Sequence, residues 1–124
     1  MPEARVALVV DDNEINRRVA VAFLKRLGWE VREADNGADA LAGLAGRSCD
    51  LVLLDVSMPG MSGIEVCRRV RADPALSSLP VLAYTAHALA EETAAMLAAG
   101  FDGILTKPVK FETLAATLRD RGFP

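Results

Sequence analysis

Several residue types and patterns are scarce in this chain of 124 residues, and each scarcity excludes a class of protein. The two cysteines, Cys49 and Cys67, have neither CxxC spacing nor a nearby histidine, so we expect no disulfide framework or thiol metal site. No apolar run approaches the roughly 20 residues that span a bilayer, and none follows the first residues as a leader would. We therefore expect a cytoplasmic protein with reduced thiols and no membrane partner.

Positive charge is also not in excess. The chain carries 14 Lys and Arg residues against 17 Asp and Glu residues, a net charge of -3, and its sequence pI is about 5.1. The basic residues are spread among acids, without the basic surface of a nucleic-acid-binding domain, so we expect no direct nucleic-acid partner. With 52% hydrophobic residues the chain can bury one core, and we expect a single domain over residues 1–124.

Apolar runs that end in polar residues are the most informative feature that is present. Short runs of this kind are typical of buried strands, and open α/β sheets bind their ligands at the carboxyl ends of the strands. If the runs are neighbouring parallel strands, their polar residues meet at one edge of the sheet. The four runs are residues 8–10 before Asp11 and Asp12, residues 51–54 before Asp55, residues 80–84 before Thr85, and residues 103–106 before Lys107.

Segments with helical spacing alternate with these strands. Asn13 fits an N-cap of a first helix with apolar residues at 15, 19, 22, 23 and 27, and Gly28 fits its end. Ser62 and Glu65 fit a capping box of a later helix. A further strand is expected over residues 29–34, and helices near residues 38–45, 62–71, 90–99 and 110–121. This alternation predicts the α/β class, a doubly wound five-stranded parallel sheet with helices on both faces.

The three acids at the expected sheet edge predict metal-assisted phosphoryl chemistry. Asp11, Asp12 and Asp55 would repel one another, and Mg²⁺ would relieve that repulsion. A carboxylate could then attack phosphorus to form an acyl phosphate, with Lys107 and Thr85 stabilising charge on the phosphoryl oxygens. We assign Asp55 as the nucleophile because it is the lone acid at its strand end, and Asp11 and Asp12 as metal ligands.

Each of these residues has an ordinary structural explanation when taken alone. Asp12 could be a helix N-cap, Thr85 a turn hydroxyl and Lys107 a solvated loop residue. Their joint occurrence at the ends of separate strands favours a site. His87, the only histidine, follows Thr85 by two residues and has no partner acid in the sequence, so we expect an exposed loop residue and not a general base.

Four motifs in this order resemble the receiver domain of two-component response regulators along nearly the whole chain: Val9–Asn16, Leu53–Gly63, Tyr84–Ala86 and Leu105–Pro108. The resemblance implies the flavodoxin-like strand order 2-1-3-4-5. It implies that Asp55 is the phosphoacceptor, Asp12 a direct Mg²⁺ ligand, Asp11 a ligand through water, and the Ser57 carbonyl group another ligand.

The resemblance also implies a switch. Thr85 would move to the phosphoryl group, Lys107 would pair with that group, and the bond before Pro108 would be cis. The phosphoryl donor would be a phosphohistidine of a sensor histidine kinase or histidine phosphotransfer protein. The last two helices would then repack and present a changed surface to an unknown downstream protein. We expect a monomer or a weak dimer.

The chain departs from the family pattern at Ile104, where members often carry an aromatic residue three positions before the lysine. Tyr84 precedes Thr85 on the same strand and should point to the opposite face, so it cannot replace that aromatic residue. Ser57 and His87 lie two residues beyond Asp55 and Thr85, where the family tunes access of water. We expect His87→Ala to change the lifetime of the acyl phosphate.

Three other functions compete with a phosphorelay receiver. An aspartate-nucleophile phosphohydrolase would commonly carry an Asp-x-Asp motif after its first strand and a cap over its substrate, and neither fits this chain. A flavodoxin-like cofactor binder would need a phosphate loop where Asp11 and Asp12 stand. A degenerate receiver acting only through protein contacts would lack some site residues. The stretch Asn13–Asn16 resembles hybrid-kinase receivers, although a single-domain regulator stays open.

Overall fold

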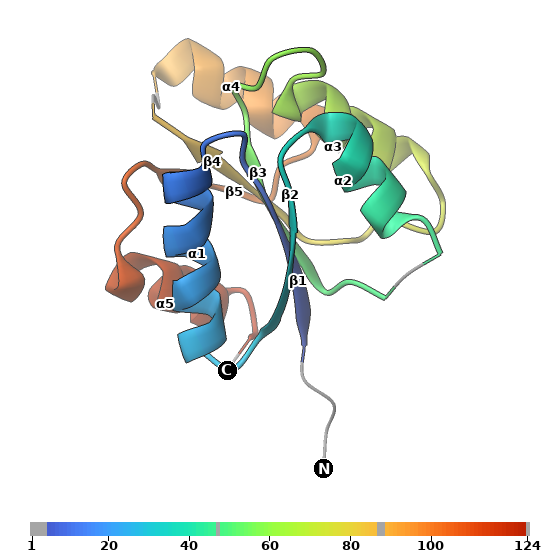
Figure 1. Ribbon diagram of the computed structural model, residues 1–124. Helices are drawn as coiled ribbons and strands as arrows, with labels where there is room; N and C mark the ends of the chain where they lie inside the picture. The colour runs from blue at the N-terminus through green and yellow to red at the C-terminus, as the bar shows by residue number, and fades with distance from the viewer. Residues whose placement is uncertain (1–4, 47, 87–88, 124) are drawn as a thin grey trace.

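The computed structural model describes residues 5–46, 48–86 and 89–123, in which five strands alternate with five helices (Figure 1). The strands are β1 (Val6–Val10), β2 (Glu30–Ala34), β3 (Leu51–Asp55), β4 (Val81–Thr85) and β5 (Gly103–Thr106). The helices are α1 (Glu14–Arg26), α2 (Gly37–Leu44), α3 (Gly63–Ala72), α4 (Ala90–Ala99) and α5 (Phe111–Asp120). None of the described helices is long and apolar enough to cross a membrane.

The strands form one parallel sheet in the order β2-β1-β3-β4-β5, which confirms the predicted fold class and strand order. In its register Val10 lies beside Leu54, and Asp55 lies beside Tyr84. The residue that follows Val10 is Asp11, so this pairing places Asp11 next to Asp55 at the carboxyl edge. The register therefore explains why acids 44 residues apart in sequence share one site.

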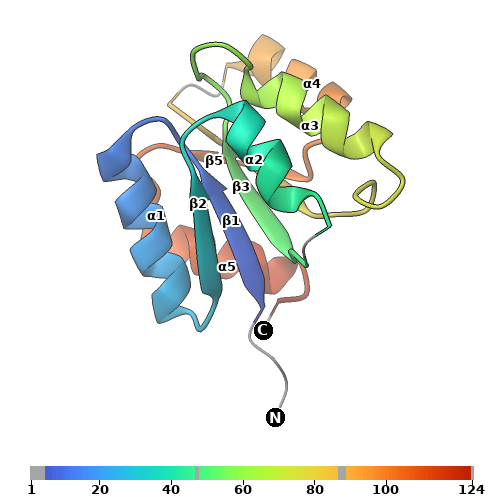
Figure 2. The same cartoon turned by 45° about the vertical axis from the view of Figure 1, so that its right-hand side comes forward.

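Two layers of helices cover the two faces of the sheet (Figures 1 and 2). Helices α1 and α5 pack on one face, where Leu24 and Leu114 are fully buried against the inner strands. Helices α2, α3 and α4 pack on the other face, where Val66 and Met96 belong to a second core. The inner strands β3 and β4 are buried over their whole length, which explains their continuous apolar sequence.

Side-chain caps set the start of three helices. The side-chain oxygens of Asn13, Asn36 and Ser62 accept hydrogen bonds from backbone N–H groups in the first turns of α1, α2 and α3. Helix α2 therefore starts at Gly37, one residue before the predicted start. At the other end of two helices, Gly28 and Gly100 have φ angles of +94° and +107°, a backbone region that favours glycine.

The buried face of α1 differs from the stripe that its sequence suggests. Ile15 and Val19 are 74% and 38% exposed, whereas Ala20, Val21 and Leu24 are buried. Apolar residues surround most of this helix, so periodicity alone identifies a helix but does not select its inner face. Packing against β1 and β2 selects it.

Candidate functional site

Three carboxyl groups meet at the carboxyl edge of the sheet. Asp11 follows β1 and is fully buried, Asp55 ends β3 and is 2% exposed, and Asp12 is exposed at the rim. One carboxylate oxygen from each residue lies within 4.8 Å of the others. The structure thus brings together the three acids in which the sequence analysis placed the metal site and the nucleophile.

Lys107 reaches this cluster from the turn after β5. Its ammonium nitrogen lies 3.0 Å from Asp11 Oδ2 and 3.2 Å from Asp55 Oδ1, and its side chain is 13% exposed. The backbone N–H of Lys107 donates to the Thr85 carbonyl oxygen at 2.7 Å, which ties the turn to the end of β4. The Lys107–Pro108 peptide bond is cis, as the resemblance implies.

The aromatic ring of Tyr84 supports the Lys107 side chain. The ammonium nitrogen lies 4.8 Å from the centre of the ring, within range of a cation–π interaction. Tyr84 is 1% exposed and belongs to the core under α1 and α5. Ile104 packs against the core on the other face, so Tyr84 does not occupy the place of the usual aromatic residue, as predicted.

The oxygens of Asp11 have unequal partners. Oδ1 accepts a hydrogen bond from the Asn13 backbone N–H at 2.9 Å. Among the described residues, none donates a well-aligned hydrogen bond to the buried Oδ2, which has only the ion pair with Lys107. A buried carboxylate oxygen whose only partner is one ammonium can also ligate a metal cation. Together with the neighbouring carboxylates it offers the hard oxygen donors that suit Mg²⁺.

Crowding changes the acidity of the site. Burial, and then the nearby charge of Asp11, raises the pKa of Asp55 from 3.8 to about 7, although Lys107 acts against this rise. Burial acts to lower the pKa of Lys107, but its contacts with Asp11 and Asp55 outweigh burial and raise that pKa. The contacts with Asp11 and Asp55 favour the charged form of Lys107, and the raised pKa of Asp55 means that a second cation would favour its ionisation near neutral pH.

Thr85 and Ser57 flank Asp55. Thr85, at the end of β4, is 4% exposed and lines a cavity of about 260 Å³ together with Ser57 and residues of α3 and α4. The Ser57 backbone N–H donates to Asp55 Oδ1 at 3.2 Å. A loop N–H therefore faces the Asp55 carboxylate. His87 falls outside the described residues.

Gly63 supports the loop that follows Asp55. Its N–H donates to the Val56 carbonyl oxygen at 3.0 Å. A Cβ atom at this position would overlap the Asp55 carbonyl oxygen and lie 2.8 Å from the Val56 Cα atom. Only glycine allows α3 to start this close to the end of β3.

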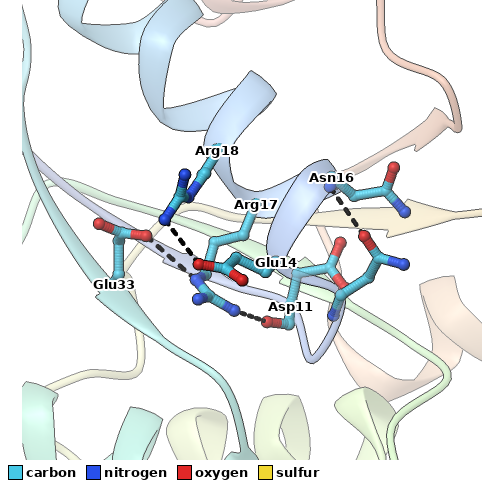
Figure 3. Close-up of polar contacts among 7 residues, drawn as sticks. Asp11, Glu14, Asn16, Arg17, Arg18 and Glu33 are labelled. Carbon is cyan, nitrogen blue, oxygen red and sulfur yellow. Dashed lines mark hydrogen bonds and ion pairs between the residues drawn. The ribbon is translucent and has the colours of Figure 1, made fainter.

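The sequence analysis missed Arg17 of α1. Its guanidinium donates to the Asp11 backbone carbonyl oxygen at 2.8 Å and forms an ion pair with Glu33 at 3.0 Å (Figure 3). A signal was available, because Arg17 lies three, four and seven residues before the buried Ala20, Val21 and Leu24. A charged residue on the inner face of a helix needs a polar partner.

Comparison with known proteins agrees with this geometry. A family model described as response regulator receiver domain matches residues 7–119. The sensor histidine kinase RcsC of Salmonella typhimurium is 44% identical over 111 residues, which are 90% of this chain and 12% of that protein. The chain thus spans about an eighth of the length of this curated relative.

Solved structures of similar size have the same fold. The chemotaxis protein CheY4 of Vibrio cholerae has a TM-score of 0.90 and 33% identity, with 95% of this chain and 98% of that chain covered. The receiver domain of the sensor histidine kinase PA1611 from Pseudomonas aeruginosa, solved with magnesium in its active-site cleft, has a TM-score of 0.88 and 30% identity, with 95% and 97% covered. By its sequence and its fold, this chain belongs to the response regulator receiver domain family.

Proposed function

We propose that the chain is a phosphorelay receiver that accepts a phosphoryl group on Asp55 in a Mg²⁺-dependent reaction. The observation that carries this proposal is the buried pair Asp11 and Asp55 with a shared Lys107 ammonium and an Asp11 oxygen that lacks a hydrogen bond. The donor would be a phosphohistidine of a sensor histidine kinase or a histidine phosphotransfer protein. The chain would act as one domain that catalyses only its own phosphorylation and dephosphorylation.

Each residue of the site has a proposed part in the transfer. Asp11, Asp12, Asp55 and the Ser57 carbonyl group would hold Mg²⁺, which supplies positive charge that offsets the acids and the incoming phosphoryl oxygens. An ionised Asp55 oxygen bonds to phosphorus as the bond from phosphorus to the donor imidazole breaks, and the imidazole nitrogen keeps the electron pair. The products are an acyl phosphate and a free histidine.

Two side chains would then contact the phosphoryl group on Asp55. The Lys107 ammonium is already 3.2 Å from Asp55 Oδ1 and can pair with a phosphoryl oxygen in place of the carboxylate. The Thr85 hydroxyl can turn toward the same group, into space that borders the cavity beside α4. We propose that this movement changes the surface formed by α4 and α5 for a downstream protein.

Intact-protein mass spectrometry after incubation with acetyl phosphate tests the proposal. We expect a Mg²⁺-dependent adduct of one phosphoryl group that hydroxylamine removes and that Asp55→Asn abolishes. Glu65→Gln, an exchange in α3 outside the acid cluster, is the matched control and should be phosphorylated normally. No adduct in the wild type, with Mg²⁺ binding established, would overturn the phosphoacceptor function and favour a module that acts only through protein contacts.

A further inference from the structure

Arg17 lies beside the acid cluster but contacts none of its carboxylate oxygens. Its Nη1 donates to the backbone carbonyl oxygen of Asp11, and its Nε lies 3.0 Å from Glu33 Oε1. The Arg17 side chain is 16% exposed, and Figure 3 shows the guanidinium between these two acceptors. Arg17 therefore joins the loop after β1 to the neighbouring strand β2.

The Asp11 carbonyl group belongs to the peptide that connects Asp11 to Asp12. A hydrogen bond to this oxygen fixes the plane of the peptide, and the plane sets the direction in which the Asp12 side chain leaves the backbone. The bond is charge-assisted and partly buried, so it is stronger than an ordinary loop hydrogen bond. Arg17 thus controls the relative orientation of two acids of the cluster.

Glu33 determines how the guanidinium is placed. It extends from β2, beside Val9 of β1, and its carboxylate accepts from the side of the guanidinium that does not face Asp11. The ion pair also offsets the positive charge of Arg17, which would otherwise repel a cation bound a short distance away. Lys107 differs, because its ammonium contacts the carboxylates themselves.

We propose that Arg17 is a positioning residue for the metal site, which aligns Asp11 and Asp12 for Mg²⁺ through the peptide between them. This inference rests on the proposed function, since it assigns Mg²⁺ to the same acids. Residues that orient metal ligands commonly change metal affinity by about 10-fold to 100-fold when they are removed. Removal of a nearby positive charge alone has the opposite effect, because it favours a cation.

Isothermal titration of the full chain with Mg²⁺ at pH 8 separates these two effects. We expect Arg17→Ala to bind Mg²⁺ about tenfold more weakly than the wild type. The matched control is Arg18→Ala, since Arg18 is the next residue, is 74% exposed and pairs with Glu14 at 2.6 Å. It should bind Mg²⁺ as the wild type does or slightly more tightly. Equal or tighter binding by Arg17→Ala would overturn the proposal, as would equal weakening by both variants.

A conservative variant is needed if circular dichroism shows that Arg17→Ala does not fold. Arg17→Lys keeps the charge but has one donor group for two acceptors, so we expect Mg²⁺ affinity about threefold below the wild type. Wild-type affinity in Arg17→Lys, with Arg17→Ala unfolded, would also overturn the proposal.

Acetyl phosphate kinetics provide a second readout. For Arg17→Ala, the Mg²⁺ concentration that gives half of the maximal phosphorylation rate should rise, while the maximal rate stays within about threefold, because Arg17 does not touch Asp55. A lower maximal rate with an unchanged Mg²⁺ requirement contradicts the proposal. If the wild type binds Mg²⁺ but is not phosphorylated, only the proposed function fails, whereas a wild type that does not bind Mg²⁺ overturns both.

Discussion

Each of the two edges of the sheet holds a basic residue that contacts acidic side chains, partly exposed at the amino edge and buried at the carboxyl edge. At the amino edge, Arg71 of α3 donates to the Gly100 and Leu79 carbonyl oxygens at 2.9 and 2.6 Å and to Asp102 Oδ2 at 2.8 Å. The same Asp102 oxygen accepts from the Val81 N–H at 2.8 Å. At the carboxyl edge, by contrast, the single ammonium of Lys107 forms ion pairs with the two buried residues Asp11 and Asp55.

The charged residues at the amino edge stabilise the fold, whereas those at the carboxyl edge form the candidate site. The Arg71 cluster, which comprises Arg71 and its acceptors at Gly100, Leu79 and Asp102, joins the ends of α3 and α4 to the starts of β4 and β5. Each acceptor receives a hydrogen bond from the guanidinium, so these contacts stabilise the fold. The site cluster buries two carboxyl groups around one ammonium and raises the pKa of Asp55, so it costs stability until a ligand binds. Four predictions test the comparison, in order of decreasing expected effect.

Removal of Arg71 should damage the amino edge most. We expect Arg71→Ala to lower the free energy of unfolding by about 2–4 kcal/mol, because the two carbonyl groups lose their charged donor and Asp102 Oδ2 keeps only the Val81 N–H. Urea denaturation measures the change. Arg68→Ala, at an exposed position of the same helix, should change stability by less than about 0.5 kcal/mol. A similar loss in both variants would show that the cluster does not stabilise the fold.

A methyl group at Gly63 should damage the carboxyl edge. We expect Gly63→Ala to cost about 1–3 kcal/mol, because its Cβ would overlap the Asp55 carbonyl oxygen and push α3 from the strand end. Gly43→Ala in α2 is the matched control, since its Cβ would meet nothing within 4 Å. That exchange should stabilise the chain by about 0.5–1 kcal/mol. Stabilisation in both variants would contradict the close approach of residue 63 to the Asp55 carbonyl oxygen.

Neutralisation of Asp55 should stabilise the chain at high pH. The folded chain holds the Asp55 proton to about pH 7, whereas the unfolded chain releases it near pH 3.8. The free energy of unfolding of the wild type therefore falls as pH rises from about 4 to about 7. Without Mg²⁺ at pH 8, Asp55→Asn should be more stable by about 1–2 kcal/mol, and the difference should shrink by pH 4.5. Urea titrations across this range would refute the idea if the difference stayed constant.

Protons should compete with Mg²⁺ for the same cluster. Because Mg²⁺ needs an ionised Asp55, whose pKa is about 7, its affinity should fall by up to tenfold per pH unit below pH 7. Above pH 7.5 the affinity should level off. Calorimetric titrations from pH 5.5 to 8.5 measure the profile, and Mg²⁺ affinity that does not vary with pH would mean that Asp55 takes no part in binding.

Much of the fold could be predicted because its signals are local. Asn13 and Ser62 cap helices through their own side chains, and Gly100 ends one with a positive φ angle. The apolar runs before Asp11 and Asp55 indicate buried strands whichever partner they pair with. The placement of the acids and Lys107 at one edge follows from the parallel arrangement, although their roles remain proposals.

Other features have no local signal. The sequence analysis identified α1 as a helix but placed Ile15, and not Ala20, in its apolar stripe, whereas Ile15 is exposed and Ala20 is buried. The sequence analysis assigned no contacts to Arg71 or Arg17, because their partners lie far along the chain or in the backbone. Tyr84 was expected to face away from Thr85, but its contact with Lys107 depends on how β4 and the turn after β5 pack.

The sequence by itself determined the alternation of strands and helices, the side-chain caps that begin α1 and α3, and the polar residues at the strand ends. These depend on hydrophobic spacing and on backbone preferences within a few residues. Only the tertiary structure decided that Asp11 and Asp55 share one ammonium, that the pKa of Asp55 rises to about 7, and that Arg17 binds the Asp11 carbonyl oxygen. Those properties depend on sheet register and on burial, which arise when distant segments pack together.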